Sequence, residues 1–305
     1  MKQAQYQATK VARKDRRVAI ATRCERVRTI KRIVGQIALQ FPGLKLDNLT
    51  ERHVMWWVRA MAAGKFSRTG RPPSVGSQKN DLSAIRFLLQ RIGKSNLLPK
   101  SNAALGIERR RYVATVSVAL DLQDHQVDLV HAHSPRFALS LRMMRAFGLR
   151  CEESLKVVPI VADRGFELQL QGSWCKNGRP RCVPIVDSTQ RALLEQAKAI
   201  AGDGSMVPPG LTYAEARSQL RELTAAIGLS HRHGLRHGYV GDRYFALTGG
   251  LPPVATGLTR HDVTAEEVHR DRAARSTIAL ELGHTRRSVL GAYLGSLFRS
   301  SRERG

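Results

Sequence analysis

Apolar residues recur at every third or fourth position through most of this chain and alternate with polar residues only in short stretches. The first spacing places them on one face of an α-helix, and the second is typical of a half-buried β-strand. Helix-type stripes cover residues 24–37, 54–61, 82–92, 137–144 and 220–227. Strand-type segments are confined to residues 157–161, 166–170 and 182–186. The pattern predicts a mainly α fold with a small antiparallel β-sheet (α+β), in which residues 157–161 are the first of three strands.

A chain of 305 residues is long enough to bury two separate cores, and we predict two domains. Residues 1–112 are predicted to form a helical domain in which Thr50 and Ser74 begin two of the helices. Residues 113–305 are predicted to form the second domain. Residues 1–17 are polar and basic, and we expect them to be a flexible arm.

Positive charge is concentrated in the first of these domains. The whole chain has 50 Lys and Arg against 25 Asp and Glu, a net charge of +25. The first 112 residues hold 25 of these cations and 6 of the acidic residues, a net +19, which leaves +6 for the other 193. Such an imbalance indicates a polyanionic partner, and double-stranded DNA fits it. A charge that serves only solubility is the alternative.

Residues 65–73, rich in glycine, proline and cations, suit contact with DNA phosphates, as do cations of the third helix and of the connection to the second domain. A solvated helix face would have the same composition. The predicted DNA-contacting residues are Lys65, Arg68, Arg71, Lys79, Arg86, Arg109, Arg110 and Arg111.

Several other classes of protein are disfavoured. No run of about 18 apolar residues is present and the N-terminus lacks the apolar core of an export signal, so we expect a cytoplasmic protein without a membrane partner. Cys175 and Cys182 could pair across a hairpin, but reduced thiols are the expected state. His231, His233 and His237 invite a zinc interpretation, yet no further ligands with the usual spacing accompany them. We expect neither a metal nor another cofactor.

The second domain places charged residues at helix ends and in turns. Ser134-Pro135 is typical of an N-cap and a first helical position, and Gly148 ends the same helix. Arg150 therefore lies in the turn just beyond, where the carboxylate of Glu153 could hold its guanidinium. Taken alone, such an arginine is more often a solvated cation or a partner of the helix dipole.

Further cations and a tyrosine follow in order. Lys176 lies in the turn between the second and third predicted strands. His233 and Arg236 are three positions apart at the start of a helix, so their side chains share one face. His284 ends another helix, and Tyr293 comes nine positions later.

These residue types suit attack by a tyrosine hydroxyl on a DNA phosphodiester. Arg150 and Arg236 would stabilise charge on the non-bridging oxygens in the transition state, because a guanidinium is planar and permanently charged. A phenol with a pKa of about 10 needs a base or nearby cations to lose its proton, and the two histidines, 233 and 284, are candidates. The departing 5′ oxygen needs an acid, and Lys176 could supply the proton.

In these motifs the chain resembles the tyrosine recombinase, or phage-type integrase, family. Members carry a G-L-R-x-x-E box, a lysine in a β-hairpin before an R-x-V-P run, an H-x-L-R-H box, and an L-G-H box with a tyrosine nine residues after its histidine. The matching segments here are Gly148–Glu153, Lys176 with Arg181–Pro184, His233–His237, and Leu282–His284 with Tyr293. The resemblance covers roughly residues 115–295 closely. A mobile-element subgroup is also similar in the Leu-Gly that follows the tyrosine.

The resemblance implies a helical N-terminal DNA-binding domain, a tyrosine recombinase catalytic domain and site-specific strand transfer without metal or external energy. Tyr293 would attack a DNA phosphate to give a 3′-phosphotyrosyl bond, and a 5′ hydroxyl of a partner duplex would reseal the strand. The other implied site residues are Arg150, Lys176, His233, Arg236 and His284, with Glu153 in support. The resemblance also implies a dimer to tetramer on DNA, allows an accessory DNA-bending protein, and indicates a bacterial protein associated with the nucleoid.

One departure from the family concerns spacing. Arg236 and His284 are 48 positions apart, about twice the separation expected of simpler members. We interpret residues 249–275 as an inserted loop over the active site and assign no role to His261 and His269 within it.

Two other functions fit part of the pattern. A non-catalytic DNA-binding regulator would keep the positive charge but has no need for Tyr293 and its cationic neighbours. A type IB topoisomerase would share the chemistry and relax supercoils as a monomer. Strand exchange between two duplexes distinguishes a recombinase from both.

Overall fold

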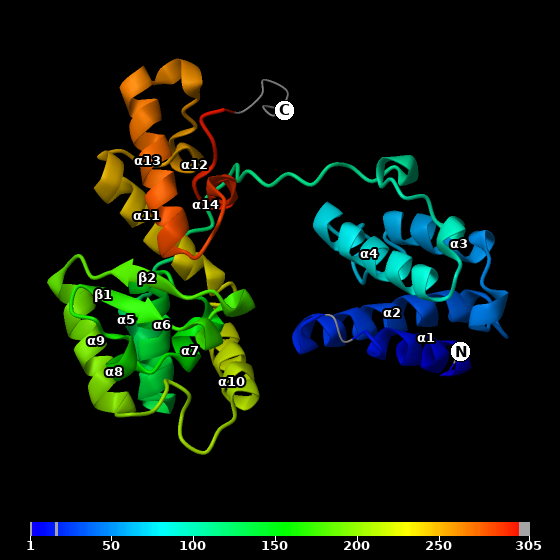
Figure 1. Cartoon of the computed structure of the whole chain (residues 1–305), viewed down its shortest axis with the longest axis horizontal. Helices are drawn as coiled ribbons and strands as arrows, with labels where there is room; N and C mark the ends of the chain where they lie inside the picture. Colours follow the sequence, from blue (N-terminus) through cyan, green and yellow to red (C-terminus); the bar gives the residue numbers. More distant parts are fainter. Residues whose placement is uncertain (1, 16–17, 299–305) are drawn as a thin grey trace. The chain divides into compact units, whose positions relative to one another are not determined.

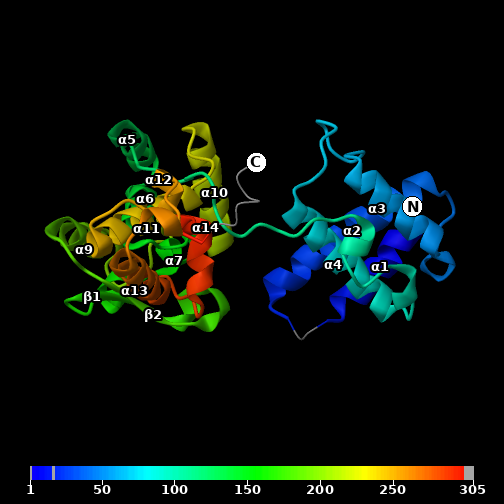
Figure 2. The ribbon, with the colours of Figure 1, turned by 90° about the horizontal axis from the view of Figure 1, so that it is seen from above.

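The structure is a computed structural model of the chain and describes residues 2–15 and 18–298. The chain divides into two compact units, residues 1–111 and 112–305 (Figure 1, Figure 2). The predicted fold class, mainly α with a small antiparallel sheet, is confirmed. Among the described residues, no helix combines the length and the apolar character that crossing a membrane requires.

The N-terminal unit is built from helices alone in its described part. Its elements are α1 (Lys2–Arg13), α2 (Ile20–Gln40), η1 (Leu46–Asn48), α3 (Glu51–Ala62), α4 (Val75–Arg91), η2 (Ser95–Leu97) and η3 (Ala103–Leu105), where η denotes a 3-10 turn. A capping box of Thr50 and His53 begins α3, and Ser74 caps α4, as predicted. Trp57 of α3 is fully buried, and its indole donates a hydrogen bond to Gln36 of α2 at 2.9 Å.

The expectation of a flexible arm at residues 1–17 is wrong for its larger part, because residues 2–13 form α1. This helix packs along α2 and buries Ala4, Ala8 and Ala12 completely. Alanines four positions apart lie on one face of a helix, and their small side chains allow a close approach of the two helices. A segment that is polar overall therefore still has an apolar face. Residues 16 and 17 lie outside the described residues.

The C-terminal unit surrounds the central helix α6. Its elements are α5 (Asp124–His133), α6 (Pro135–Phe147), α7 (Cys151–Lys156), α8 (Pro159–Ala162), β1 (Glu167–Leu170), η4 (Gly172–Trp174), η5 (Lys176–Gly178), β2 (Arg181–Pro184), α9 (Ser188–Ala201), α10 (Tyr213–Ala226), α11 (His233–Thr248), α12 (Pro253–Thr256), η6 (Arg260–Asp262), α13 (Ala265–Glu281), η7 (Arg287–Leu290) and α14 (Gly291–Leu294). Helix α6 packs against α5, α7, α9 and α11. It begins at Ser134 and ends at Gly148, as predicted. Gly148 has φ 59°, and a Cβ there would lie 2.5 Å from the Tyr239 ring, so both backbone and space require glycine.

The β-sheet is smaller than predicted. Strands β1 and β2 pair antiparallel with Leu168 opposite Val183, and in the described part of the chain no third strand joins them. The prediction of a strand at residues 157–161 is wrong, because Pro159 begins the short helix α8. Proline suits the first position of a helix, where its fixed φ fits and no backbone N–H is needed.

The long interval between Arg236 and His284 is a helical hairpin. Helix α11 leads the chain away from Arg236, and α13 packs against α11 and returns the chain to His284. The predicted loop at residues 249–275 is therefore wrong from Ala265 onward, where α13 begins. The connection between the helices follows the C-terminal end of α11, roughly 24 Å from its first residue at 1.5 Å per residue. Its helix α12 (Pro253–Thr256) packs against α14, the helix that carries Tyr293, so the expected position over the site stays a prediction.

Candidate active site

Four segments far apart in the sequence bring polar side chains together in the C-terminal unit. They are the turn before α7, the first turns of α11, the residues after α13, and α14. The carbonyl oxygen of Leu282 accepts hydrogen bonds from Arg150 at 3.3 Å and from Arg236 at 2.9 Å, which joins the first three segments. The fourth segment contributes Tyr293, whose ring centroid is 6.3 Å from that of His284. Five of the six predicted catalytic residues are therefore neighbours.

Glu153 is a buried carboxylate on which three guanidinium groups converge. Its side chain is 0% exposed, and its oxygens lie 2.6 Å from Nη1 of Arg150 and 2.9 Å from Nη2 of Arg181. Nη1 of Arg236 is 3.7 Å away. Burial alone would raise the pKa of Glu153, but Arg181 and Arg150 outweigh burial and lower that pKa to about 2. The carboxylate is therefore ionised at neutral pH and fixes the positions of the arginines.

The side chain of Arg236 is completely buried, and hydrogen bonds fix the orientation of its guanidinium. Its Nη1 donates to the carbonyl oxygen of Gly148, and its Nη2 donates to that of Leu282. Its third nitrogen, Nε, donates to the hydroxyl of Tyr293 at 3.4 Å. Burial lowers the pKa of Arg236 to about 10, which leaves the guanidinium charged at neutral pH.

The hydroxyl of Tyr293 lies between a cation and an imidazole. It accepts the hydrogen bond from Arg236, and its oxygen is 3.3 Å from Nε2 of His233. The ring of His237 packs beside the phenol, with the two centroids 4.4 Å apart. A fixed cation on one side of the phenol, and on the other an imidazole whose Nε2 accepts a proton in one tautomer, are the groups that a tyrosine nucleophile needs.

The histidines around Tyr293 are held in the neutral form. Burial, and then the charges of Arg236 and Arg150, lower the pKa of His233. Burial is also the main cause that lowers the pKa of His237 and of His284 to about 4. Neutral imidazoles can accept a proton at neutral pH. Nε2 of His284 is buried and has no hydrogen-bond partner among the described residues, so it has unused capacity for a ligand.

Lys176 lies outside this cluster. It belongs to η5 at the tip of the β1–β2 hairpin, where Asn177 has φ 64° and turns the chain. Its side chain is exposed and forms no hydrogen bond or ion pair with the part of the chain that the structure describes. Its catalytic role stays a prediction.

Sequence reasoning missed two residues of the cluster. Arg181 is buried, bonds to Glu153, and also donates to the carbonyl oxygen of Glu281. His237 contacts the Tyr293 ring. In the sequence, Arg181 stood out only as part of the R-x-V-P run, and His237 only as part of the H-x-L-R-H box and as a disfavoured zinc ligand. The available signal for Arg181 was strand alternation, because Arg181 and the apolar Val183 lie two positions apart on β2 and are both buried.

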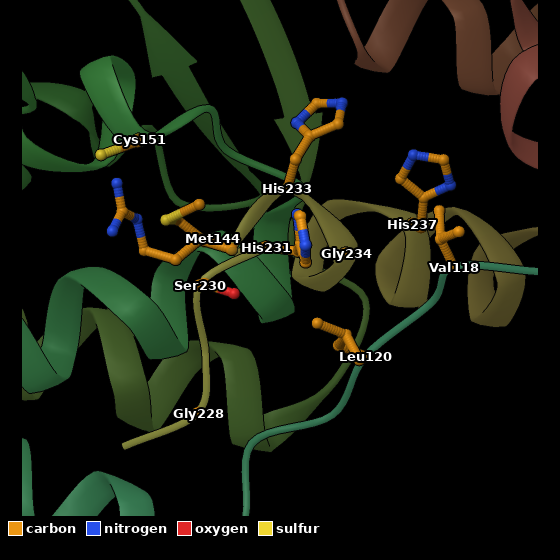
Figure 3. Close-up of a pocket in the computed structure, with 11 residues that line it drawn as sticks. Val118, Leu120, Met144, Cys151, Gly228, Ser230, His231, His233, Gly234 and His237 are labelled. Carbon is orange, nitrogen blue, oxygen red and sulfur yellow. The ribbon is translucent and has the colours of Figure 1, made fainter. Parts of the chain in front are cut away.

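A cavity of about 750 Å³ adjoins His233. Figure 3 shows His233 and His237 on the first turns of α11, with Val118 and Leu120 on the extended segment beside that helix. Met144 and Cys151 also line the cavity. His233 and His237, two of the side chains beside Tyr293, therefore border an open space rather than a closed core.

Most of the predicted DNA-contacting residues have exposed or half-buried side chains in the N-terminal unit. Lys65 lies over the Trp56 ring at 5.1 Å. Arg86 differs from the others, because it donates to the carbonyl oxygen of Pro99 and, at 2.7 Å, to Asn102. Arg86 therefore holds the segment after α4 by hydrogen bonds. DNA contact by the whole set of eight residues stays a prediction. The exposed members are Lys65, Arg68, Arg71, Arg109, Arg110 and Arg111, and Lys79 is half-buried.

The cysteines and histidines form neither a disulfide nor a metal centre in the described structure. All four cysteines, including Cys175 and Cys182, are unpaired. Among residues 2–15 and 18–298, no group of three His, Cys, Asp or Glu side chains is arranged to hold a metal ion.

Comparisons with known proteins identify the fold. No family model and no curated protein matches the chain. Among solved structures, the XerH site-specific recombinase bound to a palindromic difH substrate is 16% identical, with 98% of this chain and 82% of that chain covered and a TM-score of 0.57. A lambda integrase dimer bound to a COC′ core site is 13% identical, covering 100% of this chain and 78% of that one, with a TM-score of 0.58. The Tn1549 transposon integrase (aa 82–397) in complex with circular intermediate DNA is 13% identical, with 99% of this chain and 98% of that chain covered and a TM-score of 0.53. The chain has the tyrosine recombinase fold.

Proposed function

We propose that this protein is a tyrosine-type site-specific recombinase, a metal-independent DNA strand transferase with Tyr293 as its nucleophile. The observation that carries the proposal is the position of the Tyr293 hydroxyl, 3.4 Å from Nε of Arg236 and 3.3 Å from Nε2 of His233. The likeness of the fold to solved recombinases supports it.

In the proposed cleavage step, the oxygen of Tyr293 bonds to a DNA phosphorus atom as the bond from phosphorus to the 5′ oxygen breaks. The phenol proton passes to Nε2 of His233. The 5′ oxygen takes a proton from Lys176, whose exposed position on a hairpin tip allows it to reach a bound strand. The products are a 3′-phosphotyrosyl bond and a 5′ hydroxyl. In the second step a 5′ hydroxyl of a partner duplex attacks this phosphorus and passes its proton to Lys176, while the tyrosine oxygen leaves and takes back the proton from His233.

Charge on the non-bridging phosphate oxygens is stabilised by groups whose positions are fixed before DNA binds. Arg236 has no freedom to move, and Glu153 holds Arg150 at 2.6 Å. The unpartnered Nε2 of His284 suits a hydrogen bond to a phosphate oxygen. Donors that need no rearrangement during the reaction stabilise a transition state most effectively.

The proposed partner is double-stranded DNA, bound as a dimer to tetramer, with an accessory DNA-bending protein allowed. Lambda integrase has been solved as a dimer on a core site and as a tetramer on a Holliday junction. The similarity to a transposon integrase supports integration or excision of a mobile element as the task. Such a protein would act on DNA in the bacterial cytoplasm and associate with the nucleoid.

The nucleophile is tested with a nicked suicide duplex, in which the short 5′ fragment diffuses away after cleavage. The wild-type protein should form a covalent protein–DNA adduct that persists in EDTA. Tyr293→Phe should form none, because the attacking oxygen is absent, and denaturing electrophoresis measures both. An adduct formed by the Phe variant would show that the nucleophile is another residue.

The reaction class is tested by offering two duplexes and a supercoiled plasmid to the same preparation. A recombinase exchanges strands between the duplexes. Relaxation of the plasmid without exchange would indicate a type IB topoisomerase, and binding without any covalent adduct would indicate a DNA-binding regulator.

A further inference from the structure

The extended segment formed by residues 113–121, here called the strap, contacts the helix of the proposed nucleophile. The strap contains no helix or strand and begins directly after Tyr112 of the C-terminal unit. The backbone N–H of Ala114 donates to the carbonyl oxygen of Gly291 at 2.8 Å. Gly291 is the first residue of α14 and precedes Tyr293 by two positions. One end of the strap is therefore bonded to the backbone that carries the phenol.

The other end of the strap is bonded to α11. The backbone N–H of Leu120 donates to the carbonyl oxygen of Gly234 at 3.0 Å. Gly234 lies between His233 and Arg236, in the first turn of the helix that positions both. Figure 3 shows Leu120 and Val118 beside this turn. The strap thus joins α14 to α11 independently of the direct contact between Tyr293 and Arg236.

Two glycines of α11 allow this close approach. A Cβ on Gly234 would lie 2.6 Å from Cγ of Leu120 and 2.7 Å from the carbonyl oxygen of Val118. A Cβ on Gly238 would lie 2.8 Å from the carbonyl oxygen of Leu120 and 2.7 Å from Nε of Arg145. Both contacts include backbone atoms of the strap, which cannot rotate away as a side chain can. Any larger residue must push the strap from the helix.

A charged clamp holds the strap in place beside these glycines. Arg145 of α6 donates through Nε to Asp121 of the strap at 2.5 Å and pairs through Nη2 with Asp242 of α11 at 2.6 Å. One guanidinium therefore binds the strap and α11 at the same time, because Nε contacts one carboxylate and Nη2 contacts the other.

We infer that the strap sets the position of the Tyr293 helix relative to His233 and Arg236. Gly234 and Gly238 are then positioning residues of the proposed reaction, because the absence of a Cβ at each lets the strap lie against α11. The inference rests on the proposed function. A nucleophile displaced by about 1 Å can lose on the order of 100-fold in rate, so a bond two residues from the phenol is well placed to control catalysis.

The test compares two glycines on the same helix. Gly238→Ala should lower the single-turnover rate of adduct formation by about 100-fold while the DNA dissociation constant stays unchanged. Gly241→Ala is the matched control, because a Cβ there meets nothing within 4 Å. It should cleave at a rate within about twofold of wild type, since Ala favours a helix over Gly. A loss confined to the maximal rate, with unchanged binding and cooperative unfolding, distinguishes positioning from structural damage.

A second variant keeps the inference testable if Gly238→Ala does not fold. Asp121→Ala removes the clamp without a steric clash. It should slow adduct formation roughly fivefold, because the loss of a partly exposed ion pair has a small energetic effect. Asp128→Ala, an exposed carboxylate on α5, should have no effect. Equal rates for the Gly238 and Gly241 variants, or for the Asp121 and Asp128 variants, would overturn the inference. Absence of an adduct even from wild type and Gly241→Ala would instead refute the proposed function.

Discussion

The two units of this protein use positive charge in opposite ways. The N-terminal unit places Arg68, Arg71 and most of its other predicted DNA-contacting cations on its surface, within a segment whose net charge is +19 over 112 residues. The C-terminal unit buries Arg181 and Arg236 around the single carboxylate of Glu153. The first arrangement supplies attraction, and the second supplies fixed geometry.

The physical costs of the two arrangements also differ. An exposed cation remains hydrated, so it is inexpensive to place, but salt screens it over about 8 Å at physiological ionic strength. A buried cation must be compensated by partners, and once compensated it is neither screened nor mobile. We therefore expect the surface set to control affinity and salt dependence and the buried set to control the chemical step.

The largest expected effect is on the chemical step. Arg236→Ala should remove on the order of 3 kcal/mol or more of transition-state stabilisation, because it deletes a fixed donor beside the proposed nucleophile. Duplex binding should largely survive. Adduct formation in single turnover and DNA binding by fluorescence anisotropy are measured together, with Arg221→Ala on the surface of α10 as control. A variant that lost binding but kept cleavage would contradict the division of roles.

The next effect is on stability. Glu153→Gln should lower the free energy of unfolding by about 3 kcal/mol at pH 7, as estimated from the pKa lowered from 4.5 to about 2. This contribution is present above pH 4.5 and is lost as the pH falls from 4.5 towards 2, because over this range the unfolded chain binds a proton that the folded protein does not. Denaturant titration measures it. Glu152→Gln, at a 44% exposed side chain, should cost well under 1 kcal/mol, and an equal loss in both variants would show that the buried position has no special role.

A smaller effect should appear on mild acidification. Since the pKa of His237 and of His284 is about 4 in the folded protein against 6.5 ordinarily, the unfolded chain binds protons first as the pH falls. Stability should therefore decrease between pH 6.5 and 4. The double variant His237→Gln/His284→Gln should lose less over this range in the same denaturant titrations. Identical pH dependence in both proteins would show that these imidazoles are not held neutral.

The smallest effect should come from the surface. Arg68→Gln/Arg71→Gln should weaken DNA binding a few-fold and reduce the slope of log affinity against log salt by roughly 1 to 2, because up to two phosphate contacts are lost. The cleavage rate at saturating DNA should be unchanged. A lower rate at saturation would mean that surface cations also act in the chemical step.

Local signals predicted much of the fold. Ser134-Pro135 and Gly148 mark both ends of α6, and Thr50 and Ser74 begin their helices as expected, because caps depend on neighbouring residues alone. Two of the errors occurred where a distant element decided the outcome, whereas the missed helix α8 follows from the local signal of Pro159. Helix α1 is stabilised by contact with α2, and α13 is held against α11, and neither partner is visible in the local pattern.

The six residues proposed for catalysis could be selected from their order and spacing, since the chemistry restricts which side chains are useful. The distances between these six residues, and the partners they share, could not be predicted from order and spacing. Glu153 was expected to bind Arg150, but the structure makes it the common partner of Arg181 and Arg236 as well, through elements more than 25 positions apart in sequence.

The sequence by itself determined the types of side chain proposed for catalysis, the helical character of both units and the excess of positive charge. Only the tertiary structure decided which cations are buried, which carboxylate they share, and where the phenol of Tyr293 lies among them. The physical reason is that residue identity fixes a group's charge and hydrogen-bonding capacity, whereas desolvation and pairing depend on neighbours that only the folded chain brings within a few ångströms.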